Sequence, residues 1–318
     1  MKSRLAASFL AAAFSIALPL FNLPQEKALS PQGSLWYEPS EPEIRSDSEL
    51  YITLLDGERT LTLSMEEYLY GAVAAEMPAS FHIEALKAQA VALRTYALYK
   101  IEVSPSENHG EDLCSSSSCC AAWKPDEYLR EKWGADYALY SRIIHSAVSS
   151  TDGEYLVFGG EPVLAVFHAS SDGKTESSAA VWGKSLPYLV SVGTPESVET
   201  VRGFEEEVFF SRDELLSLLS GANAKKPLIS DEERTESGRL ASVTLFGVSL
   251  SGRQLRSLLG LGSTAVELTE EDGGLKITAR GRGHGVGMSQ FGADLMAKEG
   301  ADYREILSTY YPGTELTK

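Results

Sequence analysis

The sequence is poor in basic residues and in cysteine. Lys and Arg number 28 against 45 Asp and Glu, which gives a formal net charge of −17 at pH 7. This balance argues against nucleic-acid binding, because that function needs basic patches to meet phosphates. The three cysteines are too few for a disulfide scaffold, and all lie between Cys114 and Cys120, which indicates a local site. The sequence also lacks an internal repeat of fixed period.

Long hydrophobic runs are equally scarce, since only the N-terminus carries one. Leu5 to Leu23 is mostly apolar, and as a helix it would span about 28 Å, close to the thickness of bilayer hydrocarbon. We therefore expect residues 1–25 to form a signal-anchor helix, with a cleaved secretory signal as the alternative. Lys2 and Arg4 would stay inside, which predicts a single-pass cell-membrane protein whose bulk lies outside the cytoplasm, or a secreted one after cleavage.

The remainder of the chain divides into a linker and one domain. Residues 26–48 are rich in Pro, Ser and acidic residues, which is typical of a linker, and the domain is expected over residues 49–318. Strand-like and helix-like segments are mixed without regular βαβ alternation. The sequence therefore predicts the α+β class, with helices and a mainly antiparallel sheet in one domain.

Turn and capping signals locate the individual elements of this domain. Asp56-Gly57 and Gly159-Gly160 mark the turns of two predicted hairpins, and a third hairpin is expected over 265–281. A single strand is expected over 241–250. Capping boxes and helical periodicity predict helices over residues 65–75, 83–101, 126–134, 211–219, 252–260, 288–298 and 303–311.

Two segments near the first helices carry candidate functional residues. Glu76 falls in the last turn of its predicted helix, where exposed carbonyls disfavour negative charge and raise a carboxyl pKa. A carboxyl protonated near neutral pH can act as a general acid, although an ordinary surface glutamate is the alternative. Lys87 and Arg94 share one face of the next helix, which is otherwise apolar. A buried Arg94 needs a partner: Glu76, a ligand, or another residue in a structural ion pair.

Two further segments combine histidine with glycine or polar residues. Gly281 to Gln290 has four glycines at alternate positions, which allow positive φ and close backbone approach but do not form a dinucleotide loop. His284 has glycine on both sides, so contact with a ligand or a carboxylate explains it better than packing. His168 ends a predicted strand and precedes polar residues, which suits either a catalytic loop or a solvated turn.

The cysteine segment has the spacing of a metal site. His109, Cys114, Cys119 and Cys120 offer one imidazole and three thiolates, a set that suits a structural zinc ion with no open coordination position. The alternative is a disulfide between Cys114 and Cys119 with one free thiol, and the odd number of cysteines weakens it.

Three segments follow one another along the chain: EMPASFHIEALKAQAVALRTYAL, FHASSDGKTESSAAVWGKSLPYLVSV and GRGHGVGMSQFGA. Together they resemble the stage II sporulation protein D family, which is related to amidase-enhancer proteins. The resemblance extends from about Leu50 to Pro312. It implies a membrane-anchored lytic transglycosylase of peptidoglycan that acts in forespore engulfment, with a catalytic cleft in its domain.

The resemblance also assigns roles to residues. It implies that Glu76 is the catalytic acid and that Arg94, His168, Lys174, His284 and Gln290 bind the substrate. We expect Lys87, on the same helix face as Arg94, to bind the substrate as well. Zinc-bearing members have a His, then Cys, then His-Cys pattern, so Cys119 stands where His is usual. The segment 260–264 also lacks an Arg that is usual there.

The implied mechanism needs one carboxylate, whereas hydrolytic glycosidases normally use two. Glu76 would protonate the glycosidic oxygen and then take the proton of the muramoyl 6-hydroxyl, which closes on C1 to leave a 1,6-anhydro end. The implied partners are peptidoglycan strands, an amidase that strips stem peptides, and a membrane protein that recruits the enzyme. A glycan-binding activator of an amidase, without catalysis of its own, is the alternative function.

Overall fold

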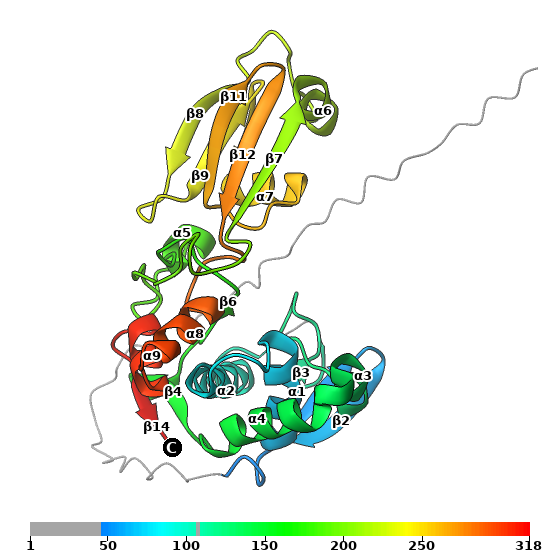
Figure 1. Ribbon diagram of the computed structural model, residues 1–318, viewed down its shortest axis with the longest axis vertical. Helices are drawn as coiled ribbons and strands as arrows, with labels where there is room; N and C mark the ends of the chain where they lie inside the picture. Colours follow the sequence, from blue (N-terminus) through cyan, green and yellow to red (C-terminus); the bar gives the residue numbers. More distant parts are fainter. Residues whose placement is uncertain (1–45, 106–108) are drawn as a thin grey trace, which may run out of the picture. The chain divides into compact units, whose positions relative to one another are not determined.

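The computed structural model describes residues 46–105 and 109–318 (Figure 1). Helices and strands alternate irregularly along the chain, and most strand pairs are antiparallel, so the predicted α+β class is confirmed. Two short strand pairs are parallel: β1 (Tyr51–Asp56) with β3 (Leu113–Cys114), and β6 (Phe167–His168) with β13 (Met288–Ser289).

The described chain begins with the predicted hairpin and helix. β1 pairs with β2 (Arg59–Ser64) across a turn in which Gly57 has φ +63°. α1 (Met65–Glu76) begins in a complete capping box, in which the Ser64 hydroxyl accepts from the Glu67 N–H and the Glu67 carboxylate accepts from the Ser64 N–H. The helix ends just before Pro78, as predicted.

α2 (Ile83–Leu98) lies at the centre of the first apolar core. Its many alanines are fully buried, which lets neighbouring helices approach closely. The helices that pack around it (Figure 1) are α1, α4 (Tyr137–Ser149), α8 (Gln290–Lys298) and α9 (Tyr303–Tyr310). The predicted helix was expected to run to residue 101, but at Tyr99 it widens into a π-helical turn, η1 (Tyr99–Val103).

The segment after the cysteines is more helical than the sequence analysis predicted. α3 (Asp126–Trp133) was expected and is confirmed. A short 3-10 turn, η2 (Gly134–Asp136), then leads into α4, which was not predicted. Ile144, Ala147 and Val148 are the buried side of α4, and their helical spacing is the signal that was missed.

The second predicted hairpin is shorter than expected. β4 (Tyr155–Phe158) and β5 (Glu161–Pro162) pair across the Gly159-Gly160 turn. The pairing ends one residue later, where the Val163 N–H donates to the Leu156 carbonyl but the Leu156 N–H donates to the Thr95 hydroxyl. β14 (Glu315–Thr317) pairs with β4 on its other side.

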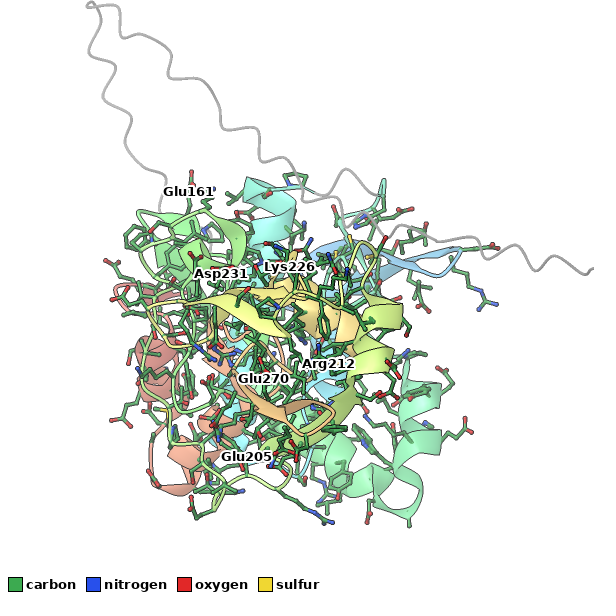
Figure 2. The ribbon with its side chains drawn as sticks, turned by 90° about the horizontal axis from the view of Figure 1, so that it is seen from above. Glu161, Glu205, Arg212, Lys226, Asp231 and Glu270 are labelled. Carbon is green, nitrogen blue, oxygen red and sulfur yellow. The ribbon has the colours of Figure 1, made fainter. Side chains whose placement is uncertain are left out.

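Two three-stranded antiparallel sheets, β10-β9-β8 and β11-β12-β7, enclose a second apolar core of Leu, Ile, Val, Phe and Ala side chains. The elements of this region, preceded by α5 (Ser178–Trp182), are β7 (Glu205–Ser211), α6 (Arg212–Leu218), β8 (Ile229–Arg234), β9 (Leu240–Leu245), β10 (Val248–Ser251), α7 (Gly252–Leu259), β11 (Val266–Glu271) and β12 (Gly274–Arg280). Its surface carries many exposed carboxylates, among them Glu205, Asp231 and Glu270 (Figure 2).

The third hairpin, α6 and α7 are confirmed here, whereas the single strand predicted over 241–250 is wrong. That segment is a hairpin, because Phe246 and Gly247 both have positive φ and reverse the chain between β9 and β10. Phe246 is fully buried, which holds it in this unusual backbone conformation. β7 and β8 were not predicted, and their runs of acidic residues conceal the strands.

The predicted signal anchor, residues 1–25, and most of the predicted linker, 26–48, lie outside the described residues. Across the described ranges, no helix combines the length and the apolar character that crossing a bilayer requires. The end of the linker is described and is a correction, since Asp47 is buried in the first core region. Contacts group the described residues, 46–105 and 109–318, into one compact unit.

Candidate functional site

Glu76 is the last residue of α1, and its side chain is largely buried. Its carboxylate Oε1 accepts a 2.6 Å hydrogen bond from the Ala122 N–H. Burial raises the pKa of the Glu76 carboxyl, and the Ala122 bond offsets part of this because it stabilises the charged form. The predicted direction of the pKa shift therefore agrees with the structure, but burial is its main cause rather than the carbonyls of the helix end.

The segment that follows the cysteines supplies this hydrogen bond. It lies against α1 at Gly71, where the Lys124 N–H donates to the Gly71 carbonyl over 3.3 Å. A Cβ at Gly71 would lie 2.6 Å from the Lys124 carbonyl oxygen, so glycine is required for this close approach. The approach brings the Ala122 N–H to the end of α1.

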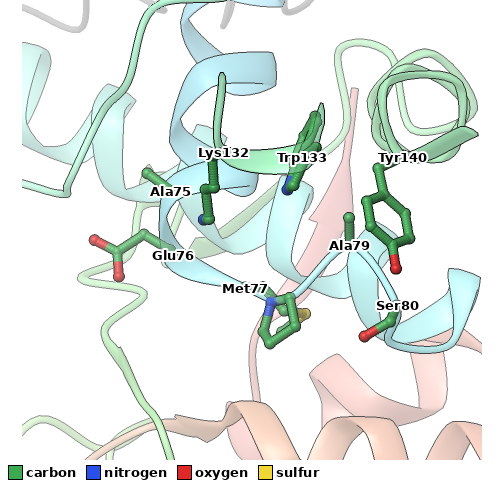
Figure 3. Close-up of a pocket in the computed structure, with 9 residues that line it drawn as sticks. Ala75, Glu76, Met77, Ala79, Ser80, Lys132, Trp133 and Tyr140 are labelled. Carbon is green, nitrogen blue, oxygen red and sulfur yellow. The ribbon is translucent and has the colours of Figure 1, made fainter. Parts of the chain in front are cut away.

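A pocket of about 330 Å³ adjoins Glu76. Besides Glu76 it is lined by the loop after α1 and by Lys132, Trp133 and Tyr140 from α3 and α4. Figure 3 shows Glu76 at one end and the two aromatic rings at the other, with the carboxyl pointing away from the rings. Lys132 Nζ donates to the Ala74 carbonyl over 3.3 Å, so it caps the end of α1.

These three side chains were not predicted from the sequence. No local motif marks Lys132, Trp133 or Tyr140, and all three depend on the fold of α3 and α4 against α1 for their position. The helical periodicity of α4 was the available signal, and it would have indicated that this segment packs against the core.

Gln290 lies next to the backbone of Glu76 and is buried. Its Nε2 donates to the Glu76 carbonyl over 3.0 Å and to Gln89 Oε1 over 3.3 Å. The sequence-based prediction that Gln290 belongs to the site therefore agrees with its place, but its amide fixes the end of α1 rather than facing an open pocket.

Arg94 and Lys87 do not face the Glu76 pocket. The Arg94 guanidinium is buried and pairs with both carboxylate oxygens of Asp47 at 2.7 and 2.5 Å, and it also donates to the Glu154 carbonyl. The predicted substrate-binding role of Arg94 is therefore wrong, because its donors already have partners within the fold. Lys87 forms a 2.6 Å ion pair with Glu84 and lies outside the set of pocket-lining residues.

The two histidines lie together, and both are packed within the fold. Both ring nitrogens of His168 have partners, the Val286 carbonyl at 3.1 Å and the Ser171 hydroxyl at 2.6 Å. The ring of His284 lies 5.7 Å from that of His168 and 5.5 Å from Trp182, so the expectation that packing explains His284 poorly is corrected. Burial lowers the pKa of His284 to about 4 and that of His168 well below its usual value, so both are neutral at pH 7.

The glycine loop over residues 281–287 brings His284 next to His168. All four of its glycines have positive φ, as their spacing predicted. At Gly287 a Cβ would overlap the Val166 carbonyl, so the loop requires glycine there. Lys174, the remaining predicted binding residue, is exposed, and its carbonyl accepts a hydrogen bond from Arg239.

The structure brings together the four predicted zinc ligands. The ligand atoms of His109, Cys114, Cys119 and Cys120 all lie within 4.8 Å of one another, and none of the cysteines is in a disulfide. Cys120 Sγ lies 3.6 Å from His109 Nε2, close to the edge of a zinc tetrahedron at about 3.7 Å. His109 Nδ1 contacts the Glu111 carbonyl at 2.8 Å, which leaves Nε2 available as a ligand atom.

The sequence is similar to proteins of one bacterial family. A family model described as Stage II sporulation protein matches residues 58–158. Stage II sporulation protein D of Bacillus subtilis (strain 168) is 36% identical over 261 residues, covering 80% of this chain and 75% of that protein. The protein of the same name from Bacillus amyloliquefaciens is 35% identical with the same coverage.

A more distant relative has a different name. The protein named amidase enhancer from Bacillus subtilis (strain 168) is 28% identical over 305 residues, which covers 78% of this chain and 40% of that protein. The match to the two Bacillus sporulation proteins is closer and extends over three quarters of their length. The chain belongs to the stage II sporulation protein D family.

Proposed function

We propose that the protein is a lytic transglycosylase that cleaves peptidoglycan between N-acetylmuramic acid and N-acetylglucosamine during engulfment. The observation that carries this proposal is the environment of Glu76, a half-buried carboxyl with a raised pKa beside a pocket of ligand-binding size. Among the described residues that line this pocket, Glu76 is the only carboxylate. A one-carboxylate reaction is therefore the chemistry that this arrangement favours.

The reaction starts with a protonated Glu76. Its proton passes to the glycosidic oxygen as the bond from C1 of N-acetylmuramic acid to that oxygen breaks. The resulting carboxylate then removes the proton of the muramoyl 6-hydroxyl, and O6 forms a bond to C1. Glu76 ends protonated, no water is consumed, and the product carries a 1,6-anhydro end. The Ala122 N–H holds the carboxylate in place and stabilises it while it is charged.

The aromatic end of the pocket supplies a surface for the sugar. Trp133 and Tyr140 offer apolar ring faces with polar edges, which suit a pyranose ring with alternating hydroxyl and C–H groups. A ring seated there would lie at the other end of the pocket from Glu76. Lys132 also lines the pocket, and its positive charge would favour an acidic sugar.

We also propose a structural zinc ion at His109, Cys114, Cys119 and Cys120. Burial raises the pKa of the Cys120 thiol to about 12, so its thiolate needs a nearby cation to compensate. Bound zinc would supply charge and a crosslink at this point. Because Ala122 follows Cys120 by two residues, the four ligands would fix the segment that carries the Glu76 hydrogen-bond donor.

The proposed location and partners follow from the substrate. Peptidoglycan lies outside the cytoplasm, so we propose that the domain acts there, held to the membrane by an N-terminal anchor. An amidase that strips stem peptides would prepare the glycan, and a membrane protein of the engulfment machinery would recruit the enzyme.

A digest of purified glycan strands, bare of peptide, tests the activity. The full chain should release 1,6-anhydro-muramoyl ends that mass spectrometry detects, and the Glu76→Gln chain should release none. Reducing ends in place of anhydro ends would mean hydrolysis and would contradict the proposal.

A second candidate is a glycan-binding activator of an amidase, which the similarity to the amidase enhancer favours. On that hypothesis neither chain cleaves the strands, both bind them, and the full chain accelerates an added amidase. The same pair of proteins therefore separates the two functions.

A further inference from the structure

Four arginines gather at the glycine loop, although the chain as a whole is acidic. Arg253 and Arg256 lie three residues apart on α7, Arg239 directly precedes β9, and Arg282 belongs to the glycine loop. Backbone contacts bring these segments together, because the Gly283 N–H donates to the Gly262 carbonyl and a Cβ at Gly252 would overlap the Leu240 carbonyl. The charges of Arg239, Arg253 and Arg282 also contribute to a lowered pKa of Arg256, behind burial as the main cause. A local excess of positive charge is unusual in a chain with a net charge of −17.

Three of these arginines lack a carboxylate partner. Within residues 46–105 and 109–318, only Arg239 of the four forms an ion pair, with Asp172. Arg253 donates to the Val181 carbonyl over 3.2 Å and Arg256 to the Leu261 carbonyl over 3.3 Å. These carbonyls orient the two side chains but leave their charges without compensation. Like charges three residues apart on one helix also repel each other.

Arg239 is the most constrained member of the cluster. It is 1% exposed, and its Nε and Nη1 have no hydrogen-bond partner although they are buried. Buried donors without partners are costly, and a ligand that supplies acceptors removes the cost. Gly285 makes room for the guanidinium, since a Cβ there would lie 2.6 Å from Arg239 Cζ.

The surroundings of the cluster suit an anion carried on a sugar. Trp182 follows Val181, the residue that accepts from Arg253, and its ring packs against His284. A cavity of about 250 Å³ lies between α5, β9 and the start of α7 and is lined in part by Arg253 and Ser251. Glu176 also lines it, but its carboxylate already accepts from the hydroxyls of Thr235 and Ser237 and from the Ser177 N–H.

We propose that Arg253 and Arg256, supported by Arg239 and Arg282, bind the lactyl carboxylate of an N-acetylmuramic acid unit. A guanidinium presents a planar pair of donors that matches a carboxylate, and the indole of Trp182 offers a surface for the attached sugar. None of the four arginines lines the Glu76 pocket, so this is a second contact with the same strand. The choice of polymer rests on the proposed function, whereas the preference for an acidic sugar rests on the cluster itself.

The test compares native glycan strands with strands whose lactyl carboxylates have been reduced to alcohols. The test protein is the full chain with the substitution Glu76→Gln, so that it binds strands without cleaving them. Binding is measured by calorimetry. We expect reduction of the carboxylates to weaken binding about tenfold or more. The additional changes Arg253→Gln and Arg256→Gln should abolish this preference.

The matched control carries Arg59→Gln and Arg142→Gln, which remove the same charge at exposed positions on β2 and α4. It should retain the preference for native strands, and thermal melting should show that both double variants are folded. The proposal is overturned if the α7 double variant keeps the full preference. It is also overturned if inorganic phosphate, at matched ionic strength, displaces the strands as effectively as N-acetylmuramic acid does.

Failure of the proposed function gives a different result. If no strand is cleaved or bound, the melting temperature of the full chain is measured with N-acetylmuramic acid and with N-acetylglucosamine. A rise with the acidic sugar alone, lost in the α7 double variant, supports the arginine site independently of catalysis. Equal shifts with both sugars, or none, would contradict it.

Discussion

The two apolar cores of the molecule differ in the polar groups that they enclose. The region around α2 buries the charged side chains of Asp47 and Arg94 and the amides of Gln89 and Gln290, and Glu76 lies at its edge. The second core, between the two three-stranded sheets, has fewer buried polar neighbours, chiefly Arg239, Ser263 and Thr278, and its carboxylates lie on the surface.

The contacts of the two regions also differ in kind. In the first region, Asp47 pairs with Arg94, and Glu76 is held by Ala122 and Gln290. In the second, β7, β11 and β12 are held by antiparallel pairing and apolar packing. Buried polar groups need specific partners. The first region therefore fixes the positions of particular side chains, whereas the second mainly stabilises the fold.

The largest contrast is expected between two glutamates. Glu76→Gln should lower the rate of glycan cleavage about 10³- to 10⁴-fold, because the side chain can no longer transfer a proton. The stability should not fall at neutral pH. The raised pKa means that the folded chain binds the Glu76 proton more tightly than the unfolded chain, so the charged carboxylate opposes folding there, and Gln removes that cost.

Glu271→Gln on β11 is the matched control, since Glu271 is exposed at the end of its strand. It should leave both rate and stability unchanged. Rates come from product release measured by mass spectrometry, and stability from urea denaturation. Cleavage by the Glu76→Gln chain at the native rate would remove Glu76 from the mechanism.

The next contrast is between two arginine ion pairs. Asp47→Asn leaves the buried Arg94 guanidinium without its counter-charge, which should cost about 3–5 kcal/mol of unfolding free energy. Glu205→Gln removes a partner of Arg280 at the surface of the second region and should cost less than about 1 kcal/mol. Denaturation in urea measures both. Equal losses would show that the Asp47 pair is not the buried anchor that its contacts describe.

Features specified by adjacent residues were predicted correctly. The capping boxes at Ser64 and Ser211, the turn at Gly57 and the positive φ of the loop glycines all depend on a few neighbouring residues. The clustering of His109, Cys114, Cys119 and Cys120 also belongs to this group, because the four residues lie within one loop, whereas zinc binding there stays a prediction.

Features that depend on distant partners could not be derived in this way. The partner of Arg94 is Asp47, which lies in a segment whose composition resembles a linker. His284 has only glycine beside it, and Trp182, about a hundred residues earlier, covers it. Trp133 and Tyr140 reach the Glu76 pocket only because α3 and α4 fold back onto α1.

A third prediction concerns metal removal from the first region. If zinc binds the folded chain alone, free zinc at 100 times its dissociation constant adds about 2.7 kcal/mol to the unfolding free energy. Chelation should remove this amount, and elemental analysis should find one zinc per chain before treatment. Cys119→His keeps four ligands and should retain the metal, whereas Cys119→Ala should lose it. Unchanged stability after chelation would contradict a structural zinc.

The smallest expected effect is a difference in pH dependence between one glutamate in each region. Burial raises the pKa of Glu76, whereas hydrogen bonds from Ser211 lower the pKa of the exposed Glu214 at the start of α6. Cleavage needs protonated Glu76, so the rate should fall about tenfold per pH unit above its pKa. The Glu214 contribution to stability is present above its unfolded pKa and is lost only as pH falls through its lowered folded pKa. Glu214→Gln should therefore leave the alkaline limb of the pH–rate profile in place, and a displaced limb would show that the titrating group is not Glu76.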